Sequence, residues 1–332
     1  MAGGAFAYWE GVMVFAFLAV VLALSLNVPM GQGGIYSAAQ GAHYGVGAYV
    51  AALVAIHMTG SVPVVLLCSI VAAAASGCVL VIPALRTRFE YFMIASLSLQ
   101  YVASTIFLTW SPLGGEDGLT GLRPGQFFGV TISAPNGYLW LSGVLAAICV
   151  LISIALRRSR FGRSLRATRD NEEAAKSLGV GVSRVRILSL IIGAGMAGAA
   201  GAVYALYVGF VNPDSFDINE SVLVFAMVIL GGVGSVLGPV LGAILLTVLP
   251  SWLTYVNLVP QIYQALTQQI IYGAVLVLMV LFRPDGILGK GRINVSKRER
   301  QEQAKGPPRL AVAGRQETEG VPAGGDDYHA GG

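Results

Sequence analysis

Long apolar stretches without charged residues dominate the hydrophobic pattern of this chain. No Asp, Glu, Lys or Arg occurs between residues 11 and 85, and none occurs between residues 221 and 282. A charged side chain at the centre of a bilayer costs about 2.5–3.5 kcal/mol even on the lenient insertion scale. A soluble amphipathic helix needs only one apolar stripe and carries charges on its other face. The pattern therefore predicts an all-α polytopic membrane protein.

Individual spans follow from the requirement of about 20 apolar residues for each transmembrane helix. Seven ordinary spans are predicted, near residues 8–27, 35–57, 61–83, 90–110, 138–156, 187–208 and 262–282. Together with the stretch 221–250, they amount to about eight transmembrane helices plus glycine-rich segments that are broken or re-entrant. The first thirty residues contain no Lys or Arg, so the first apolar run is expected to be a retained span rather than a cleaved signal peptide.

Basic residues predict how the chain is oriented. They gather at three places. Arg86 and Arg88 follow the third span, nine basic residues lie within the polar insert 157–186, and Arg283, Lys290 and Arg292 follow the last span. The positive-inside rule assigns these three clusters to the cytoplasm. The loops 111–137 and 209–220 carry more acidic than basic residues and are expected outside.

The stretch 221–250 cannot be one ordinary span in this topology. The chain is expected outside at 209–220 and inside at Arg283, so an odd number of crossings must separate them. The middle of the stretch contains residues that break helices, namely Gly231, Gly232, Gly234, Gly238 and Pro239. We expect a broken or re-entrant pair of half-helices that enters and leaves on the outer side. Three short crossings are the competing arrangement.

A second glycine-rich break is predicted at the end of the first span, at Pro29, Gly31, Gly33 and Gly34. The pair Gly33-Gly34 precedes Ser37 with the same spacing with which Gly231-Gly232 precedes Ser235. Many transporters contain internal repeats with interrupted helices in corresponding positions. The matching spacing indicates a possible internal repeat.

The composition of the chain further limits the class of protein and its partners. The chain is 55% hydrophobic and 11% charged, whereas a soluble domain carries about 25% charged residues. The net charge of +4 comes from cations beside apolar spans, so no nucleic-acid partner is expected. The cysteines lie in apolar segments without metal-ligand spacing, and no metal or cofactor is expected. From residue 289 the chain is rich in Lys, Glu, Gln, Gly and Pro, so a transmembrane domain of 1–288 should precede a disordered cytoplasmic tail of 289–332.

The polar insert 157–186 has two interpretations. Glu172 and Glu173 near a helix start, with Lys176 towards its end, suit the helix dipole and predict a short helix on the cytoplasmic face. Such a helix can lie solvated or on the lipid surface. The alternative is a docking helix that inserts into a cytoplasmic partner.

Five stretches in sequence order resemble one known family. Glu173-Ala174-Ala175, followed after three residues by Gly179, looks like the EAA loop of bacterial ABC importer permeases. The chain is similar to the branched-chain amino acid importer permeases, in particular to the larger of their two membrane subunits. The matching stretches are GQGGIYSAAQGAHYGVGAY at 31–49, GGEDGLTG at 114–121, RFGRSLRATRDNEEAAKSLGV at 160–180, VILGGVGSVLGPVLGA at 228–243 and LFRPDGILG at 281–289.

This resemblance implies a heteromeric importer in the bacterial inner membrane. Its parts would be cytoplasmic ATPase subunits, a second and different permease subunit, and an external solute-binding protein, all assembled around this chain in the lipid bilayer. ATP hydrolysis would belong to the partners, and the chain contains no G-x-x-x-x-G-K-[ST] loop. The residues that would couple to the ATPases are Glu172, Glu173, Ala174, Ala175 and Gly179.

Departures from the family pattern leave the solute open. Phe89 and Gln100 replace an expected Gly and Glu, and His43 and Tyr44 stand where the family tends to carry two aromatic residues. Branched-chain or related amino acids are the first expectation. Related permeases that carry urea or short amides share most of these stretches and are the alternative.

Four polar side chains are predicted at membrane depth: Gln32, Gln40, His43 and Gln100. Each must find a partner, because an unpaired polar group in apolar surroundings costs up to several kcal/mol. They could form hydrogen bonds between helices, or they could line the translocation path. A formal G-x-G-x-x-G at 193–198 lies within an apolar span and predicts close helix packing rather than a dinucleotide site.

Two other functional classes compete with the importer permease. An ion-coupled secondary transporter needs carboxylates at depth, and a lipid-facing enzyme needs grouped ionisable residues there. The charge-free spans offer only histidines, and the EAA-like segment favours a permease that is driven by a partner's ATP.

Overall fold

The computed structural model describes residues 2–86, 89–127, 130–132, 135–255, 270, 273–274, 277 and 286–287. These residues belong to a single unit, Met1–Lys290. The predicted tail 289–332 and nearly all of the predicted span 262–282 lie outside the described residues.

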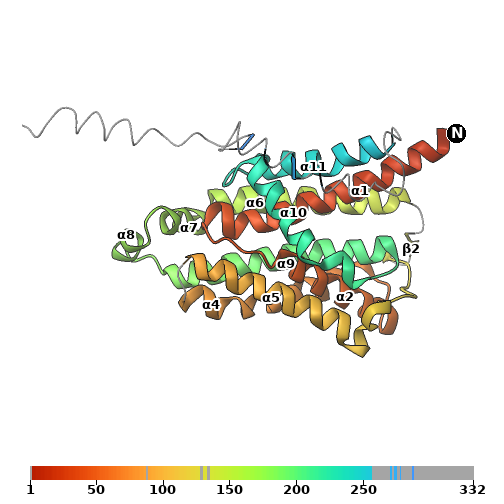
Figure 1. Cartoon of the computed structure of the whole chain (residues 1–332), viewed down its shortest axis with the longest axis horizontal. Helices are drawn as coiled ribbons and strands as arrows, with labels where there is room; N and C mark the ends of the chain where they lie inside the picture. The colour runs from red at the N-terminus through yellow and green to blue at the C-terminus, as the bar shows by residue number, and fades with distance from the viewer. Residues whose placement is uncertain are drawn as a thin grey trace, which may run out of the picture. The chain divides into compact units, whose positions relative to one another are not determined.

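Helices occupy the predicted spans that the structure describes and confirm an all-α polytopic membrane protein (Figure 1). They are α1 (Ala2–Asn27), α2 (Gln40–His57), α3 (Val62–Val79), α4 (Val81–Arg86), α5 (Phe89–Thr109), α6 (Pro135–Arg158) and α9 (Val182–Val208). Among the described residues, five helices are long and apolar enough to cross a membrane, namely α1, α3, α5, α6 and α9.

Short elements close the end of the bundle that carries the N-terminus, which we call the β2 end (Figure 1). They are η2 (Ser111–Leu113), η3 (Gly115–Asp117), β1 (Gln126–Phe127), β2 (Val130–Thr131) and η4 (Pro213–Phe216). β1 and β2 pair antiparallel, with Gln126 opposite Thr131. Leu119 and Val211 form an isolated bridge. The two loops that the charge pattern predicts outside therefore lie together.

The polar insert forms two helices at the opposite end, which we call the α8 end (Figure 1). α7 (Arg160–Asp170) follows α6 after one residue, and α8 (Glu172–Ser177) follows α7 after Asn171. Ser159 caps α7, because its hydroxyl accepts a hydrogen bond from the Gly162 amide at 3.1 Å. All the predicted basic residues of the insert therefore sit at one end of the molecule.

The core is built by close approach of α9 to α2 and α3. A Cβ on Gly47 of α2 would collide with the backbone of Gly198, and a Cβ on Gly198 would collide with Ala73 of α3. Both helices can approach α9 this closely only because these positions carry no side chain. The G-x-G-x-x-G stretch is thus confirmed as a helix-packing surface.

The stretch 221–250 is a helical hairpin rather than one span. α10 (Ile218–Gly231) and α11 (Leu237–Tyr255) pack against each other on either side of a break at 232–236. Gly232 in this break has φ +108°, which an L side chain rarely adopts. The hydroxyl of Tyr8 donates a hydrogen bond to the Ser251 carbonyl at 2.8 Å. The far end of α11 therefore returns to the N-terminal end of α1.

The two glycine-rich breaks contact each other near the α8 end. α1 passes into the π-helical turn η1 (Val28–Gln32). The Asn27 amide donates to the Ser235 carbonyl at 2.7 Å and accepts from the Gly234 amide at 3.2 Å. Gly34 and Gly232, the second glycine of each pair, both have positive φ. Both breaks therefore have a glycine with positive φ at the same place, and the wider internal repeat stays a prediction.

Candidate functional site

The predicted coupling residues form an exposed helical turn at the tip of the α8 end. Asn171 caps α8, since its side chain accepts a hydrogen bond from the Ala174 amide at 3.0 Å. Glu173 and Ala174 are exposed, whereas Ala175 is buried. Glu173 forms no side-chain ion pair within the described part of the chain. The turn is thus held from beneath by Ala175 and presents Glu173 outwards.

Gly179 ends this helix in a defined geometry. The Val180 amide bonds to the Ala175 carbonyl at 3.0 Å, and the Gly179 amide bonds to the Lys176 carbonyl at 2.9 Å. This pair of bonds is a Schellman motif, which needs a left-handed residue after the helix. Gly179 supplies it with φ +78°, and a Cβ there would meet no atom within 4 Å. The glycine is therefore required by backbone conformation and not by crowding.

Glu172 anchors the turn to α9. Its carboxylate pairs with Lys176 at 2.8 Å and with Arg186 at 2.6 Å. The hydrogen bond from Lys176, together with that from Arg186, lowers the pKa of the Glu172 carboxyl. The Lys176 pair is exposed and contributes at most about 1 kcal/mol. The Arg186 side chain is only 14% exposed, and its pair ties α8 to α9.

α7 links the coupling turn to the glycine-rich breaks. The Arg169 guanidinium donates a hydrogen bond to the Gly31 carbonyl in η1. Leu165, which is fully buried on the same helix, packs against Gly33. α7 therefore joins the α8 end to the end of α1 through two direct contacts.

Gln100 is the best-satisfied of the predicted path residues. Its side-chain oxygen accepts from the Ala42 amide at 2.6 Å and from the Ser221 hydroxyl at 3.0 Å. Its side-chain nitrogen donates to the Phe216 carbonyl at 2.9 Å. The residue is fully buried and joins α5 to α2, to η4 and to α10. Its observed contacts are those of an interhelical clamp.

Gln40 and His43 also bond to neighbouring helices. The Gln40 amide donates to the Ser25 hydroxyl of α1. The His43 ring nitrogen Nδ1 lies 2.8 Å from the Ser76 hydroxyl of α3. The structure thus brings Gln40, His43 and Gln100 together around the first turn of α2, and a role in the path stays a prediction.

Gln32 differs from the other three. It is 1% exposed, and both polar atoms of its side chain lack a hydrogen-bond partner among the described residues. Buried amides are nearly always bonded, so an orphaned one calls for a partner from outside the protein or for a change in conformation. Its position in η1, beside the α7 contacts, makes it the predicted path residue with free bonding capacity.

A cavity in the β2 half of the bundle contains an acidic residue that sequence reasoning placed in an outer loop. It has a volume of about 230 Å³ and lies between α1, α2, α10 and α11. Glu220, Tyr44, Thr247 and Ser251 supply its polar lining. Glu220 forms no ion pair with any described residue. The only sequence signal for this site is that Glu220 stands directly before a charge-free stretch of more than sixty residues, 221–282.

Comparison with known proteins identifies the family. A family model described as branched-chain amino acid transport system / permease component matches residues 8–280. The chain belongs to this family. The exposed α8 turn, the paired breaks and the acidic cavity are therefore features of a multi-pass permease component.

Relatives of this permease include proteins with different stated cargo. It is 31% identical over 293 residues to the high-affinity branched-chain amino acid transport system permease protein LivM of Escherichia coli (strain K12), covering 81% of this chain and 67% of that protein. It is 28% identical to the permease protein BraD of Pseudomonas aeruginosa, covering 82% and 92%. It is 33% identical to the autoinducer 2 import system permease protein LsrC of Klebsiella pneumoniae, covering 50% and 51%. No solved structure matches the chain.

Proposed function

We propose that this permease is the membrane-spanning subunit of an ATP-driven (ABC) importer in a bacterial inner membrane. The observation that carries the proposal is the exposed α8 turn, which ends in a Schellman motif and presents Glu173 at the tip of the basic end. This geometry suits insertion into a groove of a cytoplasmic ATPase subunit. The partners are two ATPase subunits, a second permease and an external solute-binding protein, and ATP is hydrolysed by the ATPases.

The cargo proposed is a branched-chain or related amino acid. The acidic cavity supports this choice over urea or short amides, because Glu220 can pair with the ammonium group that only the amino acid carries. Phe15, Leu18 and Leu223 provide apolar walls for an aliphatic side chain. A volume of about 230 Å³ is smaller than the roughly 300–1,000 Å³ of pockets for drug-sized ligands, which suits a small solute.

The test of coupling is ATP-dependent uptake by the reconstituted complex. The permease is co-expressed with its neighbouring ATPase and permease genes, and solute-stimulated ATPase activity is measured with the purified binding protein. Glu173→Ala should weaken co-purification of the ATPases and abolish stimulation. Arg184→Ala, an exposed change in the same polar insert at a residue without an ion pair among the described residues, serves as the control. Uptake that proceeds on an ion gradient without ATP would instead identify a secondary transporter.

The test of cargo compares solutes in one Glu220→Gln variant. We expect stimulation by leucine, isoleucine and valine to fall strongly, and any response to urea or acetamide to be unchanged. Asp214→Asn removes an exposed carboxylate from the same outer segment and should leave both responses intact. If amino acids still stimulate ATPase activity fully in Glu220→Gln, the cavity is not part of the translocation path.

A further inference from the structure

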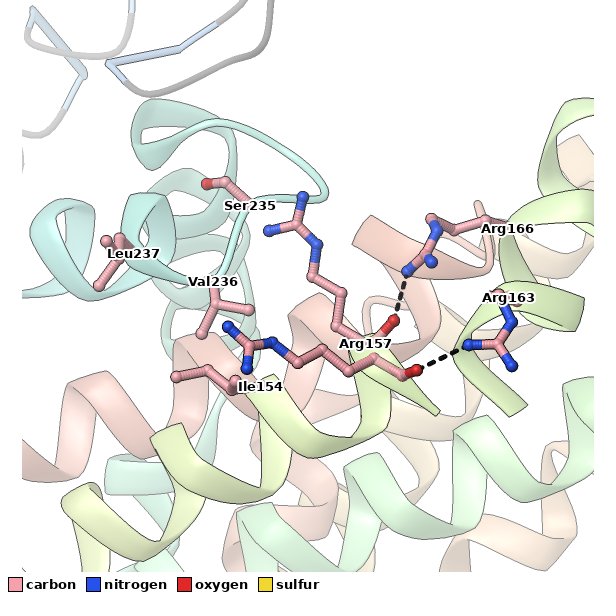
Figure 2. Close-up of a pocket in the computed structure, with 8 residues that line it drawn as sticks. Ile154, Arg157, Arg163, Arg166, Ser235, Val236 and Leu237 are labelled. Atoms are coloured by element: carbon pink, nitrogen blue, oxygen red, sulfur yellow. Dashed lines mark hydrogen bonds between the residues drawn. The ribbon is translucent and has the colours of Figure 1, made fainter. Parts of the chain in front are cut away.

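A cleft lined by arginines lies at the α8 end, apart from the coupling turn. It has a volume of about 690 Å³ and opens between the last turn of α6, α7 and the break between α10 and α11. Figure 2 shows Arg157 reaching from α6 towards Ser235, with Arg163 and Arg166 on the α7 side. Arg158 completes a set of four guanidinium groups around one hollow.

No carboxylate of the described residues neutralises this cleft. Both ion pairs found in that part of the chain are made by Glu172, with Lys176 and Arg186. Arg163 and Arg166 each donate one hydrogen bond, at 2.9 Å, to the carbonyls of Arg158 and Arg157. These bonds aim the two guanidinium groups and leave most of their donors free. Four like charges held together in this way favour an anion with several acceptor oxygens.

The position of the cleft points to the membrane surface. Arg157 and Arg158 end α6, one of the helices long and apolar enough to cross a membrane. Leu151, only two turns earlier on α6, is 65% exposed, and Leu237 on the rim is 62% exposed. Cations directly beside exposed apolar side chains meet lipid phosphates at the boundary between headgroups and acyl chains.

An apolar groove continues from this cleft along α11. It has a volume of about 490 Å³ and is lined by Leu241, Ile244, Leu245, Val248 and Trp252, among others. Leu237 at the cleft and Leu241 in the groove are four residues apart, so they lie on one stripe of the helix. The basic cleft is thus followed by an apolar stripe, just as the charged headgroup of a phospholipid is followed by its acyl chain.

We propose that this permease binds an anionic glycerophospholipid, with its phosphate among Arg157, Arg158, Arg163 and Arg166 and an acyl chain along the α11 stripe. The phosphate supplies the acceptor oxygens that the guanidinium groups lack. The site holds the break between α10 and α11 against α6. This inference stands independently of which solute the permease carries.

The experiment measures lipid bound to the full-length protein by native mass spectrometry. Protein purified in a neutral detergent is titrated with dioleoyl phosphatidylglycerol, and dioleoyl phosphatidylcholine is the comparison lipid with the same chains. Arg157→Gln/Arg158→Gln is the test variant, because neither side chain donates a hydrogen bond recorded within the described structure. Arg160→Gln/Arg184→Gln removes two exposed charges of the same insert outside the cleft and is the matched control.

The wild type should retain phosphatidylglycerol in preference to phosphatidylcholine. The test variant should bind phosphatidylglycerol about 25-fold more weakly, at about fivefold for each basic side chain near an anionic lipid, and the control should bind like the wild type. Leu237→Glu adds a carboxylate at the rim without removing an arginine, and it should also weaken binding. This second variant tests the site even if the double arginine variant does not fold.

Three outcomes would overturn the proposal. The first is equal phosphatidylglycerol binding by the wild type and the test variant, whether or not the variant still associates with an ATPase. The second is equal retention of phosphatidylglycerol and phosphatidylcholine by the wild type. The third is release of the lipid by inorganic phosphate at equal concentration, which would assign the cleft to a free anion.

Discussion

At the scale of single residues, Gly179 decides whether the coupling turn keeps its shape. Its φ of +78° is left-handed, and an L side chain in this conformation costs roughly 1–2 kcal/mol. We expect Gly179→Ala to open the Schellman motif and to lower co-purification of the ATPase subunits and solute-stimulated ATPase activity together. Pull-down and activity assays on the reconstituted complex measure both effects.

Gly209 provides a matched control for Gly179. It ends α9 with φ +70°, and a Cβ there would also meet no atom within 4 Å. It lies at the β2 end, away from the coupling turn. Gly209→Ala should therefore carry the same backbone strain and leave coupling intact. Equal losses of coupling in both variants would mean that strain anywhere, and not the shape of α8, reduces activity.

Gln100 is predicted to matter for stability before transport. Gln100→Leu leaves the Ala42 amide without its partner, and the Phe216 carbonyl keeps only the 3.4 Å hydrogen bond from the Ser104 hydroxyl. An orphaned buried group costs about 1–3 kcal/mol. We expect a clearly lower thermal unfolding temperature in detergent, measured against Gln126→Leu, where the side chain is exposed. If Gln100→Leu unfolds like the wild type but loses uptake, the path role predicted from the sequence is the better account.

These residues also define the limit of what the sequence predicts. A glutamine inside an apolar span must find a partner, and this much follows for Gln100 from the cost of burial. That the partners are Ala42 and Phe216 depends on how distant segments pack. Glu220 is harder still, because its place in an acidic loop hides the fact that α10 begins two residues earlier and carries it into the bundle.

At the scale of elements, α7 is predicted to transmit motion between the coupling turn and the breaks. Arg169→Gln removes the hydrogen bond to the Gly31 carbonyl but leaves Leu165 packed against Gly33. We expect the complex to assemble normally while solute-stimulated ATPase activity and uptake fall. Arg184→Gln, an exposed basic position of the same insert, should change neither. Loss of assembly in Arg169→Gln would assign the arginine to docking instead.

The sequence predicted elements well where a single physical requirement fixes them. The span 187–208 and helix α9 agree at their outer end, because lipid demands one continuous apolar helix there. The span 35–57 was less accurate, since α2 begins only at Gln40. The chain before it turns through Gly34 with φ +70°, and apolarity alone does not show such a turn. The break in 221–250 was predicted from its cluster of glycines, and it contains Gly232 and Gly234. Gly231, Gly238 and Pro239, which were also predicted to break the helix, lie within α10 and α11.

At the scale of the whole molecule, the arrangement of helices gives the two ends different chemistry. The α8 end gathers the basic insert and both glycine-rich breaks, whereas the β2 end carries the acidic loops (Figure 1). The hairpin of α10 and α11 connects them, since its break contacts Asn27 and its far end contacts Tyr8. A solute entering beside Glu220 would therefore reach the glycine-rich breaks next. A movement of the breaks would then be passed to α8 through the contacts of α7.

This arrangement makes a prediction about which side of the membrane each end faces. In a variant without Cys68, Cys78 and Cys149, a cysteine at Ser251 should react with a membrane-impermeant maleimide from outside. A cysteine at Ser235 should react only from the cytoplasm, because the break lies beside the arginines that the positive-inside rule retains there.

Exposed positions calibrate this labelling experiment. Asp214→Cys marks the β2 end, and Lys176→Cys marks the α8 end. Labelling in whole cells and in inverted vesicles compares each test position with both markers. The hairpin requires Ser251→Cys to follow the first marker and Ser235→Cys to follow the second. Labelling of Ser251→Cys only in inverted vesicles would contradict the hairpin.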